Sequence, residues 1–469
     1  MKYTPEEVIQ FVQEENVRFI RLAFCNVYGK QHNVSIMPSE LKRAFAYGIA
    51  FDASAVDGFG GEIRSDLLLH PDPSTLIQLP WRPEQGKVMQ MFCDISYPDG
   101  RAFERDTRSL LKRAVADASA RGFQFAFGAE MEFYLFRLDE CGEPTRIPYD
   151  HAGYMDIVPD DKGETIRREI CLMLEQMGIQ PESSHHESGP GQNEIDFRYS
   201  APLTAADNAV TFHAVVRTAA AQNGLCASFS PKPLADRDGN GMHINVSVKC
   251  DEVAQPLPGI IAGILAHIRD MTLFMNPCEE SYRRLGHNKA PLYVTWSAEN
   301  RSQLIRIPAA VGEYRRAELR SADPMANPYI AYALLIYAGM HGVEHDLQLC
   351  PASDFNVYTA PAEVLNGLKK LPGSLYEAAA LAEASAFIRK HLPEAVISAY
   401  CHRYRALIGS GERRGEHDLS GTDIQRTDCH RHGQFHREDH ASAPCDGLLA
   451  GNGGTQHRRG APKNLGNGI

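Results

Sequence analysis

The sequence predicts an α+β protein with two domains, and three observations support this prediction: the chain length, short apolar runs separated by turns, and helices with recognisable caps. At 469 residues the chain is too long for one compact core and short enough for two. Hydrophobic residues make up 43% and charged residues 23%, as in ordinary globular proteins. We expect a smaller domain over residues 1–104 and a larger one over residues 105–408.

Short apolar runs alternate with turn residues in the first segment. Residues 19–24 (Phe-Ile-Arg-Leu-Ala-Phe) and 87–93 (Lys-Val-Met-Gln-Met-Phe-Cys) have the composition of strands. Residues 97–100, Tyr-Pro-Asp-Gly, form a turn signal, and a helix of mixed charge should begin near Asp106. We therefore expect a small α+β domain that ends at this turn.

The larger segment combines strictly alternating strands with helices that have recognisable ends. Residues 204–207, Thr-Ala-Ala-Asp, resemble a capping box, and the helix that they would start should end at Gly224. Asn327 and Pro328 supply a cap and a first-turn proline for an apolar helix from Tyr329. These signals predict two long helices in the larger domain.

The composition changes after Ile408. Gly, Arg, His, Asp and Asn dominate residues 409–469, and Phe435 is the only aromatic residue there. Such a segment cannot bury enough apolar surface to offset the entropy lost on ordering. We predict a disordered tail.

Charge and apolar content exclude several classes of protein. A net charge of -11 opposes binding to a phosphate backbone, so nucleic acid is not an expected partner. The acidic first residues show no secretory signal, and the apolar stretch 330–340 is shorter than the ~18 residues of a membrane span. The 11 cysteines contain no C-x-x-C pair, which predicts reduced thiols. We expect a cytoplasmic protein without a membrane anchor.

Acidic side chains share one face of a predicted strand over residues 127–135. Its odd positions are Phe, Ala, Met, Phe and Leu, whereas Glu130 and Glu132 lie on the opposite face because side chains alternate along a strand. The segments 194–199, 242–248 and 316–320 repeat this pattern of one apolar and one polar face. Their polar faces contain Glu194, Asp196 and Arg198; His243, Asn245 and Ser247; and Arg316, Glu318 and Arg320.

A solvent-facing polar surface is the usual explanation for one such strand. Four such strands together favour a cation site, because closely packed carboxylates repel one another unless cations or protons neutralise them. Oxygen ligands with one imidazole indicate Mg²⁺ or Mn²⁺ rather than Zn²⁺. Glu187, which begins a Gly/Pro loop ahead of Glu194 and follows His185 and His186, is a further candidate ligand.

Arginines accompany these acids. Arg301 and Arg306 precede Arg316 and Arg320, and guanidinium groups bind carboxylates and phosphates through paired hydrogen bonds. Surface salt bridges are the alternative for any single arginine. Metal ligands with clustered arginines indicate phosphoryl chemistry. The sequence has neither a Walker A loop nor a G-x-G-x-x-G motif that opens a helix after a strand, so an ATP site would be of another type.

At these residues the chain resembles glutamine synthetase, specifically the bacterial class I form without the central insertion. The resemblance runs from near residue 15 to about residue 405. The matching motifs are Phe-Asp-Ala-Ser at 51–54, Gly-Ala-Glu-Met-Glu-Phe at 128–133, His-His-Glu at 185–187, Gly-Gln-Asn-Glu-Ile-Asp at 191–196, Lys-Pro at 232–233, Gly-Asn-Gly-Met-His at 239–243, Asn-Arg-Ser at 300–302, Arg-Ile-Pro at 306–308, and Glu-Leu-Arg-Ser-Ala-Asp-Pro at 318–324.

This resemblance implies a fold and an assembly. It implies an N-terminal β-grasp domain followed by a catalytic domain whose curved antiparallel sheet forms an open barrel flanked by helices. Active sites would lie between neighbouring subunits of two stacked rings, a dodecamer. The implied activity is ATP-dependent ligation of ammonia to L-glutamate through a γ-glutamyl phosphate, which gives glutamine.

The resemblance also implies roles for individual residues. Two Mg²⁺ or Mn²⁺ ions would be held by Glu132, Glu187 and Glu194 and by Glu130, His243 and Glu318. Glutamate or its γ-phosphate would contact Gly239, Arg284, Arg301 and Arg320, and ATP would contact Glu182, Ser247, Arg306 and Arg316. Asp52 would reach the ammonium site of the next subunit, and Asp52, Arg301 and Arg320 would take part in catalysis.

The sequence departs from the family pattern around the expected acceptor site. A flap loop that normally has glutamate before Ala-Pro has Lys289 there, and a lysine neither attracts ammonium nor acts as the same base. Asp238 replaces the usual Asn, and Ala55 a common Ser. A γ-glutamyl ligase for an organic amine is therefore an alternative hypothesis. A non-catalytic structural or glutamine-sensing relative is another, which the presence of every expected metal ligand opposes.

Overall fold

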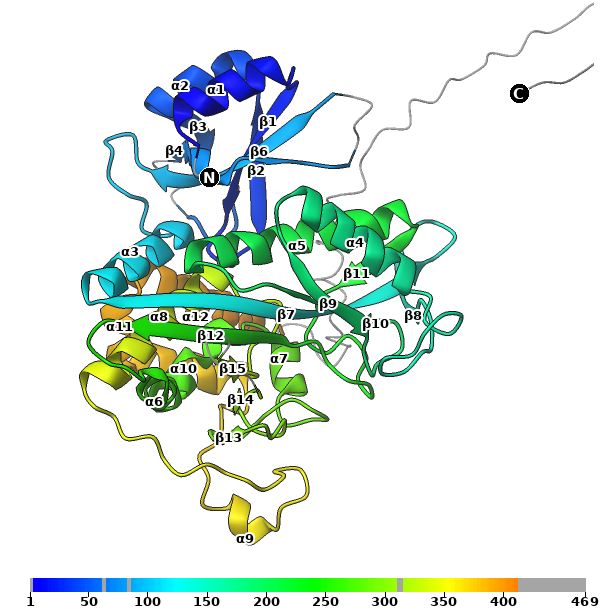
Figure 1. Cartoon of the computed structure of the whole chain (residues 1–469), viewed down its shortest axis with the longest axis vertical. Coiled ribbons are helices and arrows are strands. Elements are labelled where there is room, and N and C mark those ends of the chain that lie inside the picture. The colour runs from blue at the N-terminus through cyan, green and yellow to red at the C-terminus, as the bar shows by residue number, and fades with distance from the viewer. Residues whose placement is uncertain (1–2, 61–64, 82–85, 310–314, 412–469) are drawn as a thin grey trace, which may run out of the picture. The chain divides into compact units, whose positions relative to one another are not determined.

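Two β-sheets with separate hydrophobic cores make up the described part of the protein (Figure 1). The structure is a computed structural model that describes residues 3–60, 65–81, 86–309 and 315–411, without the side chains of 404–411. The described residues belong to one compact unit, so the predicted boundary near residue 104 stays a prediction. The predicted tail lies outside the described residues, apart from residues 409–411, which end the last helix.

The N-terminal sheet has six strands in the order β2-β1-β6-β4-β3, with β5 paired to β6. Strands β1 and β6 are parallel neighbours, and the other pairs are antiparallel. The bounds are β1 Phe19–Cys25, β2 Gln31–Ile36, β3 Ile49–Asp52, β4 Asp66–Pro71, β5 Ile77–Gln78 and β6 Val88–Ser96, with helices α1 Pro5–Glu14, η1 Pro38–Glu40, α2 Leu41–Tyr47 and η2 Pro73–Thr75. This is the β-grasp domain that the resemblance implies.

The predicted strands, turn and following helix of this segment are confirmed. Both apolar runs are strands, β1 and β6. In the turn at 97–100 the Gly100 amide donates to the Tyr97 carbonyl at 3.0 Å. Helix α3, Thr107–Ala120, is capped by Asp106, whose carboxylate accepts from the Arg108 amide.

The larger sheet has nine strands in the order β13-β14-β15-β12-β7-β10-β9, with β8 and β11 also paired to β7. It curls into a half-barrel, and its pairs are antiparallel except for β13 and β14 at one edge. The bounds are β7 Phe123–Leu138, β8 Pro144–Pro148, β9 Pro181–His186, β10 Gln192–Phe197, β11 Leu225–Ser228, β12 Met242–Cys250, β13 Trp296–Ala298, β14 Ile305–Ile307 and β15 Ala317–Leu319. The four strands that were predicted to have one apolar and one polar face are thus β7, β10, β12 and β15.

The alternation of apolar and polar side chains determines which face of this sheet packs against the hydrophobic core. Every odd residue of β7 from Phe127 to Leu135 is buried with the apolar residues of β12. Helices cover this core, and α8 packs extensively on α6 and α3. The bounds are α4 Glu164–Gln176, α5 Pro202–Gln222, α6 Leu257–Met275, α7 Glu279–Arg284, α8 Pro328–Glu344, α9 Ala362–Leu365, α10 Leu375–Ala384, α11 Ala386–His391 and α12 Glu394–Gly411.

One predicted helix start is wrong and one is confirmed. Helix α5 begins at Pro202, before the proposed capping box, because the Asp207 carboxylate is bound to Arg108 and Tyr329 and does not cap. Its end is as predicted, since Gly224 follows in the left-handed region with φ 68°. Asn327 caps α8 by accepting from the Tyr329 amide at 3.0 Å.

Helix α6 has the length and apolarity of a membrane span. Among the described residues it is the one helix that meets both criteria, and 56% of its apolar window is buried. A helix buried to this extent is typical of a core helix. The apolar stretch at 330–340 that the sequence singles out is also a buried helix, part of α8.

Arg108 of α3 joins elements of both sheets. Its guanidinium is 3% exposed and lies 3.0 Å from Asp72, 2.9 Å from Asp94 and 3.0 Å from Asp207. Asp94 belongs to β6 in the N-terminal sheet, whereas Asp207 belongs to α5 in the larger domain. One buried cation therefore neutralises carboxylates from both cores.

Histidines from α6, α8 and α11 form a cluster. The Nε2 atom of His267 lies 2.7 Å from Nδ1 of His341, so one ring donates to the other. Burial and the charge of His341 lower the pKa of His267 to about 4. Burial lowers the pKa of His391, also to about 4, with contributions from Lys390, His267 and His341.

This cluster predicts loss of stability in acid. A histidine with a lowered pKa in the folded chain takes up its proton first in the unfolded chain. The stability that it contributes is present above its ordinary pKa of 6.5 and is lost as the pH falls to about 4. We expect His267→Gln, which keeps a hydrogen bond but cannot be protonated, to lose less unfolding free energy over that range in urea titrations. His402→Gln, at an exposed position within α12, should behave as wild type, and parallel pH profiles for all three proteins would contradict this account.

Candidate metal and phosphate site

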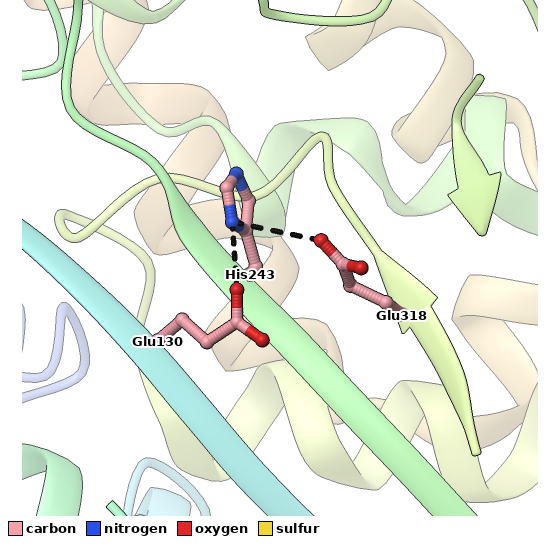
Figure 2. A group of neighbouring side chains, drawn as sticks. All are labelled: Glu130, His243 and Glu318. Carbon is pink, nitrogen blue, oxygen red and sulfur yellow. Dashed lines mark hydrogen bonds and ion pairs between the residues drawn. The ribbon is translucent and has the colours of Figure 1, made fainter. Parts of the chain in front are cut away.

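Glu130, His243 and Glu318 lie together on three neighbouring strands, β7, β12 and β15 (Figure 2). His243 is directly opposite Glu130 in the register of β7 and β12, and its Nδ1 atom lies 3.2 Å from the Glu130 carboxylate. The same nitrogen lies 3.7 Å from Glu318. One donor atom from each residue fits within 4.8 Å of the others, so these three can hold one metal ion. This predicted set is brought together by strand register.

A second group contains Glu187 and Glu194 with His185. The imidazole of His185 lies 3.9 Å from Glu187 and 3.6 Å from Glu194. The resemblance to glutamine synthetase implies Glu132 as the third member instead. Glu132 is directly opposite Glu194, but its carboxylate accepts from the Gly241 amide at 2.8 Å and from Gln192 at 3.1 Å.

The two groups are adjacent, because Glu130 and Glu194 form a third set of close donor atoms with Asp196. The close packing of these acids shifts their pKa values. Burial, followed by the charges of Glu132 and Asp196, raises the pKa of Glu194 well above its ordinary value. Burial and the charge of Glu130 raise the pKa of Asp196 to about 7. Burial opposes ionisation of Glu130 too, but His243 lowers its pKa to about 2.

These shifts test whether the residues fit a divalent cation. Acids whose pKa is raised by neighbouring acids hold protons unless another positive charge replaces them. Carboxylate oxygens with an imidazole are suitable ligands for Mg²⁺ or Mn²⁺. The donor set therefore fits the ions expected from the sequence.

Arginines surround Glu318. Arg306 donates to its carboxylate from Nε at 2.6 Å, and Arg320 donates at 3.2 Å. Arg316 donates to Asn245, which is opposite Glu318 in the β12–β15 register. The predicted phosphate-binding cations thus border the first metal group.

The remaining predicted residues have varied surroundings. Arg301 is exposed, and its carbonyl accepts from Arg320. Arg284 is buried and donates to the carbonyls of Ser321 and Arg320, at 2.8 and 3.2 Å. A side chain at Gly239 would meet the Pro231 carbonyl at 2.2 Å, so only glycine fits there.

For three further predicted residues the structure gives mainly the strand on which each lies: Glu182, Ser247 and Asp52. Glu182 is exposed on β9, and Ser247 is half-buried on β12. Asp52 is exposed at the end of β3, where the Ser54 amide donates to it at 2.9 Å and the hydrogen bonds to Ser54 lower its pKa. Within the described ranges Asp52 makes no hydrogen bond or ion pair with the acidic groups.

Sequence reasoning missed the residues that support the 187–194 loop. His186 is fully buried behind it, with Nδ1 2.6 Å from the Glu187 carbonyl and Nε2 2.9 Å from Asp150. Arg167 binds Asp161 and donates to Asn193 at 2.6 Å. Alternation along β9 was the available signal for His186, because adjacent residues on a strand face opposite ways. Asp150 and Asp161 lie between β8 and α4, where periodicity carries no signal.

Lys289 lies beside the second group. Its ammonium donates to Ser188 at 2.6 Å and lies 3.6 Å from the Glu187 carboxylate. The ring of Tyr154 is 4.7 Å from the same nitrogen. Asn288 donates to Asp238, so the Asp238 side chain contacts the residue next to Lys289.

A sheet face that combines carboxylates, histidines and arginines is typical of enzymes that bind divalent cations and phosphorylated substrates. Comparison with known proteins makes the class specific. Residues 104–407 match the model of the glutamine synthetase catalytic domain, and residues 16–98 match that of its β-grasp domain.

Individual relatives agree. The chain is 42% identical over 415 residues to a glutamine synthetase from Clostridium saccharobutylicum, covering 85% of this chain and 94% of the relative. A glutamine synthetase from Methanosarcina mazei is 41% identical over 413 residues, with 85% and 92% covered. The solved structure of a GmaS–ADP complex superposes with a TM-score of 0.78 at 26% identity, covering 90% and 99%. The chain belongs to the glutamine synthetase family.

Proposed function

We propose that the protein ligates ammonia to the γ-carboxylate of L-glutamate with ATP as phosphate donor, forming glutamine, ADP and phosphate. The observation that carries this proposal is the pair of adjacent acidic groups, bridged by Glu130 and Glu194 and bordered by arginines. Relatives named glutamine synthetase, matched over most of the chain, support the same activity.

Two Mg²⁺ or Mn²⁺ ions are the cofactors in this proposal. Glu130, His243 and Glu318 would hold one, and Glu132, Glu187 and Glu194 the other, with His185 as an added donor. When bound, such ions neutralise the phosphate oxygens of ATP. Arg306, Arg316, Glu182 and Ser247 would contact ATP, and Gly239, Arg284, Arg301 and Arg320 would contact glutamate.

The reaction proceeds in two transfers. The γ-carboxylate oxygen attacks the terminal phosphorus of ATP, so that ADP leaves and a γ-glutamyl phosphate forms. Arg320 is placed to stabilise the charge of the transferred group, because it lies beside Glu318 on the sheet face. The amine nitrogen then attacks the acyl carbon, the carbon–oxygen bond to phosphate breaks, and a carboxylate takes the amine proton.

We further propose a cytoplasmic homo-oligomer of stacked rings. Asp52 supports this arrangement, since its carboxylate is exposed and, within the described ranges, makes no hydrogen bond or ion pair with the acidic groups of its own chain.

Ligation of an organic amine is the second candidate function. The observation that favours it is Lys289, whose positive charge lies 3.6 Å from Glu187. Like charges repel, so this lysine opposes binding of free ammonium at that carboxylate.

Purified protein with ATP, Mg²⁺ and glutamate should release phosphate on addition of ammonium, putrescine or ethanolamine, whichever it accepts. Mass spectrometry of the product then identifies the acceptor. A chelator should abolish the activity, and reactions without glutamate provide the control. Activity confined to an organic amine would exclude the ammonia assignment, and no turnover with any amine would favour a non-catalytic role.

A further inference from the structure

Lys289 lies in the segment between α7 and β13, and its side chain is 58% exposed. Its ammonium nevertheless has three partners: the Ser188 hydroxyl at 2.6 Å, the Glu187 carboxylate at 3.6 Å and the face of the Tyr154 ring at 4.7 Å. Hydroxyl, carboxylate and aromatic face each attract an organic cation. We call Tyr154, Glu187 and Ser188 the ammonium cradle.

The cradle adjoins the second acidic group. Glu187 belongs to both, and the ring of His185 packs edge-on against Tyr154 with centroids 5.4 Å apart. A lysine side chain ends in a primary ammonium group, so its position shows the class of group that the cradle binds. An acceptor amine must reach this same region to attack a glutamyl group held beside the metal ligands.

Charges around Lys289 decide which acceptors fit. Glu187 is the acid within 4 Å of its ammonium, and metal coordination would take up that negative charge. The nearby Asp238 carboxylate is bound by Asn288. Arg320 adds positive charge to the segment, since its Nη1 atom lies 3.5 Å from the Lys289 carbonyl. The surroundings of a bound acceptor are therefore positive.

We propose that Lys289 sets the charge preference of the acceptor site: it competes with ammonium for the cradle and favours an amine that carries an acidic group over one that carries a second cation. This inference rests on the proposed ligase function. When an amine enters the cradle, the displaced lysine faces the amine's substituent. A carboxylate there gains an ion pair, whereas a second ammonium is repelled.

Three acceptors with a three-carbon spacing test the proposal: β-alanine, propylamine and 1,3-diaminopropane differ in the charge at the far end. For wild type we expect kcat/KM to fall by about fivefold at each step in that order, as for an exposed ion pair. Lys289→Glu should reverse the order. Lys289→Gln should remove the differences and lower the KM for ammonium by about fivefold. The exposed Lys369→Gln is the matched control and should keep the wild-type order.

Hydroxylamine separates failure of this proposal from failure of the ligase function, because it is a neutral nucleophile at neutral pH. Wild type and Lys369→Gln should form γ-glutamyl hydroxamate at the same rate, and both Lys289 variants should form it at a detectable rate. Absence of hydroxamate in every protein would refute the ligase function itself. Two results would overturn the role of Lys289 while leaving the ligase function intact. In the first, hydroxamate forms and wild type, Lys289→Gln and Lys289→Glu prefer the three amines in the same order. In the second, hydroxamate forms but none of the three amines is turned over.

Discussion

Replacing Glu130 by glutamine should lower kcat by at least about a hundredfold at Mg²⁺ concentrations that saturate the wild type. Glu130 is expected to have this effect because it belongs to two of the close donor sets, one with His243 and Glu318 and one with Glu194 and Asp196. An amide keeps the size of the side chain and removes the negative charge. Initial rates of phosphate release against Mg²⁺ concentration measure the effect.

A matched change at Glu140 serves as the control. Glu140 follows β7 in an exposed turn, so Glu140→Gln makes the same chemical change away from the site. It should retain wild-type rates and Mg²⁺ dependence. Wild-type kinetics in Glu130→Gln would show that the Glu130 group is not where the metal acts, and circular dichroism of both variants checks that the fold is intact.

The largest effect on stability is expected at Arg108. Changing it to methionine should lower the free energy of unfolding by about 3–5 kcal/mol, because Asp207 would remain buried without its cation. Asp207 is 10% exposed and Asp72 16%, so water cannot replace the lost guanidinium fully. Urea unfolding at neutral pH gives the measurement.

Arg113 lies on the same helix and is exposed, so Arg113→Met controls for loss of charge and of helix propensity. Its unfolding free energy should stay within about 0.5 kcal/mol of wild type. A difference of less than ~1 kcal/mol between Arg108→Met and wild type would refute a stabilising role for this buried cluster.

Alternation and composition predicted the parts of the fold that depend on neighbouring residues in sequence. The buried faces of β7 and β12 follow directly from their period, and the cap at Asn327 follows from its residue type ahead of Pro328. The motifs that resemble glutamine synthetase then supplied the candidate ligands, and Glu130, His243 and Glu318 do lie together.

Contacts between segments that are distant in the chain could not be predicted from the sequence. Nothing in the period of β7 or β12 says that His243 faces Glu130, since a shift of pairing by one residue would fit each strand alone. The wrong prediction of a helix start at Thr204 also results from a contact between distant segments. Asp207 is bound by Arg108, which lies 99 residues away in sequence. Lys289 was recognised as unusual, but its contact with Ser188, 101 residues away, required the structure.

The register of three strands has a consequence for how this protein can vary. His243 pairs with Glu130, and Asn245 pairs with both Gly128 and Glu318, so the distances between the donor atoms are fixed by backbone hydrogen bonds. Inserting or deleting a single residue within β12 would rotate its histidine into the apolar interior while leaving most of the sheet intact. Length changes should therefore be tolerated in the connecting loops and rejected between residues 242 and 246. Correct pairing of these strands and binding of the metal ion thus depend on the same residues.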